Sequence, residues 1–294
     1  MGLTDLDHRP LIVAAVTPLT DGGAALDLEA IAPYAAFLEA RGADGVFACG
    51  TTGEGVLLSL EERREAAVAF RAAVRGELIV HCGALSTADT VALAAHAAEI
   101  GADAVAVIPP PYFVLDTDAL VAHMTAAARA CAPLPFWGYA FTARSGYPLS
   151  PEAIARIRDG ADNFIGLKVS ESPWERLEPY LDLGLPVLVG NEPMIPRAMA
   201  RGALGSVSGM AACLPEVVRA ALDGPDEAAG QVLRDVRSTL EAAGQFVAAA
   251  KYLLGRRGVP VKPDMRAPLR RLTAEESRAL DEASRAFLEP APTR

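Results

Sequence analysis

Cysteine and histidine are both scarce in this sequence, with four of each among its 294 residues. The cysteines, at positions 49, 82, 131 and 213, show neither CxxC spacing nor a dense framework. This pattern predicts free thiols in a reducing, cytoplasmic compartment. The histidines form no HExxH or comparable ligand pattern, so no metal centre is predicted. A GxGxxG turn, which would indicate dinucleotide binding, is also absent.

An excess of basic residues is missing as well. The 27 Lys and Arg are outnumbered by 37 Asp and Glu, which gives a net charge of −10. This balance argues against nucleic acid and anionic membranes as partners. The apolar runs fall short of the ~18 residues that a membrane span needs. Residues 1–10 lack the apolar core of a secretion signal, so none is predicted.

Short apolar segments that suit buried parallel strands alternate with helical segments along most of the chain. The eight predicted strands are residues 11–16, 46–49, 78–82, 104–108, 135–139, 164–168, 187–189 and 206–208. With 51% hydrophobic residues, the chain can bury a full core. The pattern predicts an α/β fold, a (β/α)8 or TIM barrel. An open, doubly wound sheet is the alternative, but it would more naturally contain the missing glycine-rich turn.

Capping residues predict where several helices begin. Ser59 and Glu62 form a capping box before a helix over residues 60–75, and Ser150 precedes a proline at the start of another helix. Thr87 is predicted to cap a helix that reaches residue 100, and Ser172 to cap the helix after the sixth strand.

From residue 225 onward only helical patterns remain. One long helical region is predicted to run to Leu254, and Thr273 with Glu276 caps a last helix. No linker separates this part from the rest. We therefore expect a barrel over residues 1–222 and a C-terminal helical extension over residues 223–294, packed on the barrel as one structural unit.

The sixth predicted strand, residues 164–168, ends in Lys168. A strand-end lysine usually reaches into water, because an ammonium group is costly to bury. Held in dry surroundings, its pKa falls, and the neutral amine can attack a keto carbon to form a Schiff base. Side chains alternate along a strand, so Phe164, Gly166 and Lys168 are predicted to share a face, with Gly166 leaving room beside the amine.

Other reactive groups follow neighbouring strands. Tyr139 ends the fifth predicted strand, and Thr51 and Thr52 follow the second. In a barrel the carboxyl ends of the strands form one rim, so these groups are expected to converge on Lys168. Each of these groups has an ordinary explanation when taken alone. Tyr139 could be a boundary aromatic, and the segment with Thr51 and Thr52 could be a tight turn. Arg144, which follows the fifth strand, could be a solvated loop residue. Their joint placement around one lysine favours a catalytic site.

With these residues in these places, the sequence resembles the dihydrodipicolinate synthase and N-acetylneuraminate lyase family of class I aldolases. The likeness covers nearly the whole chain, and the segments that carry it are residues 50–54, 110–112, 139 with 144–146, 166–168, 205–209 and 266–269. The resemblance implies a pyruvate aldolase that needs no cofactor and works as a homo-oligomer, a dimer or a tetramer.

The resemblance also implies roles for individual residues. Lys168 is similar to the Schiff-base lysine that captures pyruvate or another 2-keto acid, and Tyr139 to the proton shuttle beside it. Thr51 resembles the hydroxyl that links this tyrosine to a second one. Thr52 and the backbone of its loop, which begins at Gly50, would hold the pyruvate carboxylate; loop N–H groups before a helix suit an anion on physical grounds too.

Three further positions match the family. Tyr112 resembles the tyrosine that reaches into the site of a neighbouring subunit. Val207 matches the position whose carbonyl faces the lysine. Arg144 matches the arginine that binds the carboxylate of the second substrate in dihydrodipicolinate synthases.

The chain also departs from the synthase pattern. Ala140 and Thr142 replace a frequent asparagine and proline, residues 81–83 are closer to the lyase branch, and residues 190–192 lack the usual acidic pair. Because Arg144 is suited to an incoming carboxylate, condensation of pyruvate with an aldehyde such as aspartate semialdehyde leads the alternatives. A 2-keto-3-deoxy sugar acid aldolase or dehydratase comes next, ahead of N-acetylneuraminate lyase. A non-catalytic homologue is least favoured, since lysine, tyrosine and threonine are all intact.

Overall fold

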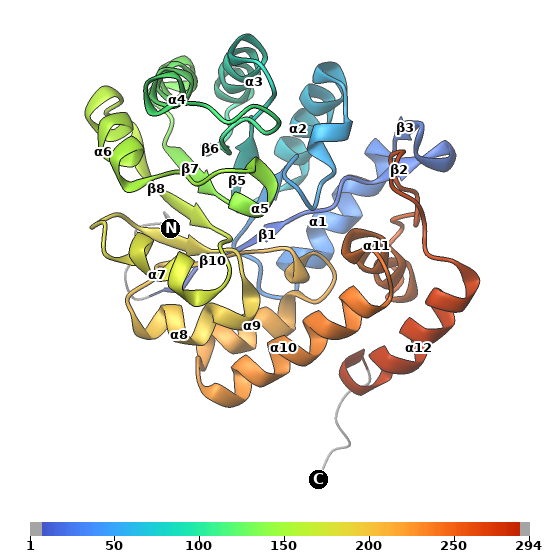
Figure 1. Cartoon of the computed structure of the whole chain (residues 1–294). Helices are drawn as coiled ribbons and strands as arrows, with labels where there is room; N and C mark the ends of the chain where they lie inside the picture. The colour runs from blue at the N-terminus through green and yellow to red at the C-terminus, as the bar shows by residue number, and fades with distance from the viewer. Residues whose placement is uncertain (1–7, 289–294) are drawn as a thin grey trace.

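Eight parallel strands close into a barrel in the computed structural model, which describes residues 8–288 (Figure 1). Around the barrel the order is β1, β10, β9, β8, β7, β6, β5 and β4, and β4 pairs with β1 to complete the closure. The strands are β1 Leu11–Ala14, β4 Gly45–Ala48, β5 Glu77–His81, β6 Ala104–Val107, β7 Phe136–Ala140, β8 Phe164–Val169, β9 Val187–Val189 and β10 Gly205–Ser208. The predicted barrel is confirmed, and the open sheet is excluded.

Helices surround the barrel between successive strands (Figure 1). They are α1 Ile31–Glu39, α2 Leu60–Ala73, α3 Thr87–Glu99, α4 Thr117–Cys131, α6 Pro151–Gly160, α7 Trp174–Leu181, α8 Ile195–Ala200 and α9 Pro215–Asp223. Two small elements were not predicted: a ribbon of β2 Leu19–Thr20 with β3 Ala25–Leu26, and the one-turn helix α5 Thr142–Ser145. Among the described residues, no helix combines the length and the apolar character needed to cross a bilayer.

The helix caps agree with the sequence in part. The capping box of Ser59 is present, because its side chain accepts from the backbone of Glu62 and the Glu62 side chain accepts from the backbone of Ser59. Ser150 caps α6 as predicted. The prediction for Thr87 is wrong by one position, since Ser86 accepts the capping bond. The cap at Ser172 is also wrong: Pro173 precedes α7 and, lacking a polar side chain, makes no capping bond.

The long helix predicted between residues 225 and 254 is two helices, α10 Glu227–Ala242 and α11 Phe246–Arg256. The chain turns at Gly244, whose φ of +116° suits glycine far better than any other residue. The final helix, α12 Ala274–Leu288, follows a capping pair of Thr273 and Glu276. α10, orange in Figure 1, packs on the outer side of α8 and α9.

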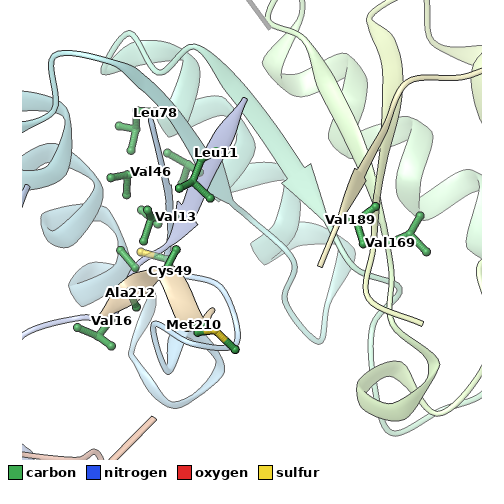
Figure 2. Close-up of a cluster of buried hydrophobic side chains, with 14 of the residues drawn as sticks. Leu11, Val13, Val16, Val46, Cys49, Leu78, Val169, Val189, Met210 and Ala212 are labelled. Atoms are coloured by element: carbon green, nitrogen blue, oxygen red, sulfur yellow. The ribbon is translucent and has the colours of Figure 1, made fainter. Parts of the chain in front are cut away.

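Two apolar cores hold the barrel together. The larger core lies between the outer face of the strands and the helices. Figure 2 labels some of its members, including Leu11, Val46 and Val189. The smaller core fills the barrel itself and contains Ile12, Phe47, Ile79, Trp137, Tyr139 and Val207, among others. Outside a bulge in β8, inward and outward residues alternate along the strands, which places reactive inward side chains above a packed floor.

A bulge in β8 changes the predicted faces of that strand. Phe136 pairs with Phe164, but the next pair joins Trp137 to Gly166, so Ile165 is the extra residue. Phe164 consequently belongs to the outer core and not to the face of Lys168, which corrects the prediction. Gly166 does not leave free space either. A β-carbon there would lie 2.4 Å from the indole of Trp137, so the absent side chain admits that ring.

Candidate active site

Lys168 lies near the carboxyl end of β8 with its side chain inside the barrel mouth, where only 3% of the residue is exposed. Its Nζ sits 3.8 Å from the ring centre of Phe47 and 4.1 Å from that of Tyr139. Burial lowers the pKa of the amine to about 7, and the negative charge of Glu192 opposes this fall only in part. A large share of Lys168 is therefore neutral, and so nucleophilic, near neutral pH.

Tyr139 is the residue of β7 that pairs with Lys168 in the barrel register. Burial raises the pKa of its phenol, while hydrogen bonding to Thr51 and Ser170 opposes the rise. The structure thus brings Lys168, Tyr139 and Thr51 together, as the sequence predicted. A phenol that stays protonated and is flanked by two hydroxyl groups is suited to passing a proton to or from a reacting atom.

The loop after β4 is held in an unusual conformation. Cys49 and Glu54, at its two ends, have φ values of 58° and 56°, a region that few non-glycine residues adopt. Thr17 donates a hydrogen bond of 2.7 Å to the carbonyl of Gly53, which fixes the loop from the β1 side. Rare backbone angles at a rim of this kind are typical of functional sites.

Gly50 and Thr52 take defined places in this loop. A β-carbon at Gly50 would lie 2.7 Å from the ring of Phe47, so the glycine lets that ring lie beneath the amine of Lys168. Thr52 is half-buried, and its hydroxyl would lie 3.0 Å from a β-carbon at Gly209, just after β10. The Thr52 hydroxyl therefore lies against the segment that follows β10.

Glu192 was not singled out in the sequence, yet it lies fully buried beside this site. Its carboxylate accepts hydrogen bonds from Ser208 Oγ at 2.8 Å, the Met210 amide at 2.9 Å and Arg237 Nη1 at 2.8 Å. The negative charge of Glu192 acts to raise the pKa of Lys168 and that of Tyr139. Its position just after β9 is the signal that could have identified it, because barrel sites are built from such strand ends.

Arg144 lies exposed on α5, directly above the end of β7. Its guanidinium is 5.4 Å from the ring centre of Phe141, and its positive charge lowers the pKa of Tyr139. The Arg144 side chain therefore overhangs the same rim as the buried lysine, and within residues 8–288 no hydrogen bond or ion pair occupies its donors.

Val207 and Tyr112 lie in contrasting places. Val207, in β10, is buried in the inner core. Tyr112 follows β6, is 86% exposed and packs edge-on against Phe113 with ring centres 4.9 Å apart. No ring contact or hydrogen bond within residues 8–288 joins Tyr112 to Thr51 or Tyr139. Within one chain, therefore, Tyr112 does not join Tyr139 and Thr51, although the resemblance implied that a second tyrosine is linked to them.

His81 completes the ring cluster around the lysine. Its ring packs edge-on against Tyr139, with centres 5.9 Å apart, and its Nδ1 lies 3.3 Å from the carbonyl oxygen of Cys49. Since a carbonyl can only accept, Nδ1 carries the proton. Burial keeps the pKa of His81 well below its usual value, so the imidazole adds no charge beside Lys168. Residues 8–288 contain no group of three His, Cys, Asp or Glu placed to hold a metal ion.

Comparison with known proteins identifies the family. The model of the dihydrodipicolinate synthetase family matches residues 7–286. An uncharacterised DapA-like lyase of Halobacterium salinarum is 34% identical over 92% of this chain and 91% of its own, and 4-hydroxy-tetrahydrodipicolinate synthase 1 of Streptomyces coelicolor is 35% identical over 94% of each chain. The structure of Proteus mirabilis N-acetylneuraminate lyase superposes with a TM-score of 0.86 at 29% identity, covering 95% of this chain and 98% of that one. The chain therefore belongs to the dihydrodipicolinate synthetase family and is a lyase of the class I aldolase type.

Proposed function

We propose that this lyase makes or breaks a carbon–carbon bond at C3 of pyruvate, while C2 of pyruvate is held as an imine on Lys168. The observation that carries the proposal is the buried amine of Lys168, with its pKa lowered to about 7, in register with Tyr139. A neutral amine beside a protonated phenol is the pair that imine formation requires.

The chemistry begins when the neutral Nζ of Lys168 attacks C2 of pyruvate and the carbonyl oxygen becomes a hydroxyl. Tyr139 supplies the proton with which that hydroxyl leaves as water, and the protonated imine remains. Thr51 orients the phenol, and Thr52 with the amides of its loop holds the carboxylate of pyruvate.

The protonated imine then acts as the electron sink. Tyr139, left as a phenolate by the loss of water, takes a proton from C3 to give an enamine. C3 of the enamine then bonds to the aldehyde carbon, and Tyr139 returns the proton to the aldehyde oxygen. Water hydrolyses the resulting imine, which releases the product and regenerates Lys168. Because the imine accepts the electrons, no metal or redox cofactor is required, and we expect full activity after dialysis against EDTA.

The second substrate in this proposal is an aldehyde that carries a carboxylate, with aspartate semialdehyde as the first candidate. Arg144 supports this choice because a guanidinium binds a carboxylate through two parallel hydrogen bonds. The likeness to a 4-hydroxy-tetrahydrodipicolinate synthase points the same way.

Cleavage of a 2-keto-3-deoxy sugar acid is the second candidate. Its support is the similarity to an N-acetylneuraminate lyase and the presence of His81, which resembles the lyase branch. The second substrate would then be a neutral aldehyde, and Arg144 would contribute little to its turnover.

The test combines trapping with a substrate panel. Borohydride added with pyruvate should place a reduced pyruvyl group on the peptide that contains Lys168, and Lys168→Met should abolish the label. Pyruvate with aspartate semialdehyde, pyruvate with glyceraldehyde, and several 2-keto-3-deoxy acids are then compared. Labelling at another lysine, or none, would contradict the imine; turnover confined to sugar acids would favour the second candidate.

A further inference from the structure

Glu171 is a buried acidic side chain to which neither the sequence nor the proposed chemistry assigns a role. It lies three residues beyond Lys168, and only 3% of it is exposed. No lysine, arginine or histidine among residues 8–288 forms an ion pair with it. A buried carboxylate without a cation is costly, so its hydrogen bonds must hold it in place for a structural or functional reason.

Among residues 8–288, the hydrogen bonds to the Glu171 carboxylate come from one residue, Thr142. The Oε1 atom of Glu171 accepts from the Thr142 amide at 2.7 Å and from the Thr142 hydroxyl at 2.8 Å. Thr142 is the first residue of α5, the single turn that carries Arg144. Glu171 thus binds the start of this turn through two charge-assisted bonds, which are stronger than neutral ones.

The rest of α5 is held by its own backbone and by the buried Ser145 hydroxyl, which donates to two backbone carbonyls. Arg144 and Ser145 both donate to the carbonyl of Phe141, and Gly146 donates to that of Thr142. One turn of helix is not stable alone, because nucleation fixes several dihedral angles for one hydrogen bond. The direction in which Arg144 points therefore depends on what holds the start of the turn.

Glu171 is itself held on the Lys168 strand. The amide of Ser170 donates to the carbonyl of Ala140 at 2.9 Å, which continues the pairing of β8 with β7. Asn191, after β9, donates through Nδ2 to the carbonyl of Glu171 at 3.4 Å. The carboxylate thus links the turn of Arg144 to the strand that carries the reactive amine.

We propose that Glu171 is a positioning residue that sets Arg144 at a defined place over the amine of Lys168 and so makes the site selective for a carboxylate-bearing second substrate. This inference rests on the proposed role of Arg144. Glu171 acts only through Thr142 and does not touch pyruvate.

The experiment compares Glu171→Ala, Glu171→Gln, Arg144→Ala and the Arg144→Ala/Glu171→Ala double variant. Glu171→Ala should lower kcat/KM for aspartate semialdehyde by about tenfold to a hundredfold, mainly through KM. Borohydride trapping of pyruvate and turnover of glyceraldehyde should stay within about twofold of the parent. Glu171→Gln, which keeps an acceptor oxygen, should recover most of the loss. The double variant should be no worse than Arg144→Ala, since both changes remove the same contact.

Thr142→Val provides a second route in case Glu171→Ala does not fold. It removes one of the two hydrogen bonds and should raise the same KM by about threefold to tenfold, with trapping unchanged.

The outcomes separate the two proposals. If Arg144→Ala impairs aspartate semialdehyde but neither Glu171→Ala nor Thr142→Val does, the positioning role is overturned and the proposed function stands. Additive losses in the double variant, or an equal loss of pyruvate trapping, would show that Glu171 supports the fold generally, and would also overturn the role. If Arg144→Ala has no effect on any carboxylate aldehyde, the assignment of Arg144 fails and the inference fails with it.

Discussion

At the scale of single residues, the site depends on how burial shifts the pKa values of Lys168 and Tyr139 in opposite directions. Burial disfavours ammonium and phenolate alike, so it lowers the pKa of the lysine and raises that of the tyrosine. A large share of the nucleophile is consequently deprotonated near neutral pH, while its neighbour keeps a proton to give. One dry environment therefore prepares both partners of imine chemistry.

The rate of imine formation should follow the titration of Lys168. Only the neutral amine attacks, so the rate with pyruvate should rise about tenfold per pH unit below the pKa of about 7 and level off above it. An unperturbed lysine would keep rising to about pH 10.4. Rapid borohydride quenching at several pH values measures this profile. A rate that still increases tenfold between about pH 8 and about pH 9 would contradict the lowered pKa.

Tyr139→Phe should separate proton transfer from pyruvate binding. Removing the hydroxyl should lower kcat by about 10²–10⁴-fold, because general acid–base catalysis contributes about that much. The ring remains, so its contact with the Lys168 amine and the burial of that amine are kept. Steady-state kinetics measure kcat, and borohydride trapping over long incubation measures pyruvate capture. Tyr147→Phe is the control. A change in kcat below about threefold would show that Tyr139 is not the shuttle.

At the scale of elements, a buried ion pair connects the C-terminal helices to the loop after β4. Lys251 of α11 lies 2.5 Å from the carboxylate of Glu54, and both residues are almost completely buried. Lys251 also donates to the carbonyl of Asp264 at 2.7 Å, and the amide of Arg266 donates to Glu54 at 2.7 Å. The loop that ends in Glu54 also contains Thr51 and Thr52, so the C-terminal segment supports the active-site rim.

Lys251→Met should destabilise the protein strongly. It would leave the Glu54 carboxylate buried with no cation, which costs about 3–5 kcal/mol in comparable pairs. Urea unfolding measures the change in free energy. Adding Glu54→Gln should recover a large part of the loss, because the uncompensated charge is then removed. A single-variant cost below about 1 kcal/mol would show that the pair contributes little.

At the scale of the whole molecule, apolar side chains gather on the loop after β6. Tyr112, Phe113 and Val114 are consecutive and are exposed by 86%, 72% and 75%. Tyr112 also has a φ of 88°, a strained value for an aromatic residue. A strained, exposed apolar loop is typical of an interface, and we propose that a second copy of this chain covers it, as the resemblance implied for Tyr112.

Phe113→Asp with Val114→Asp should therefore weaken self-association. The parent protein should sediment as a dimer or tetramer, and the double variant as a smaller species with much lower kcat, since Tyr112 would no longer reach its neighbour. Analytical ultracentrifugation and kinetics test both points. Val232→Asp, an apolar residue exposed on α10, is the matched control and should change neither. A fully active monomer would refute the proposed role of Tyr112.

The sequence by itself determined the barrel and the placement of Lys168, Tyr139 and Thr51 at its rim. Strand and helix signals are local, because alternating apolar runs and capping residues depend on neighbours a few positions away. The order of eight such units leaves few topologies, and strand ends then meet at one rim. That is why the sequence alone predicts that Lys168, Tyr139 and Thr51 lie together.

Tertiary structure alone decided which of the surrounding groups matter. The bulge at Ile165 arises from pairing with β7, and the filling of Gly166 by Trp137 depends on a distant ring, so neither is visible in the pattern of β8. The ion pair of buried Glu192 with half-buried Arg237, and the link from Glu171 to Thr142, join residues 45 and 29 positions apart. The charge state of a buried group follows from all that packs around it, and packing between distant segments is set only when the chain has folded.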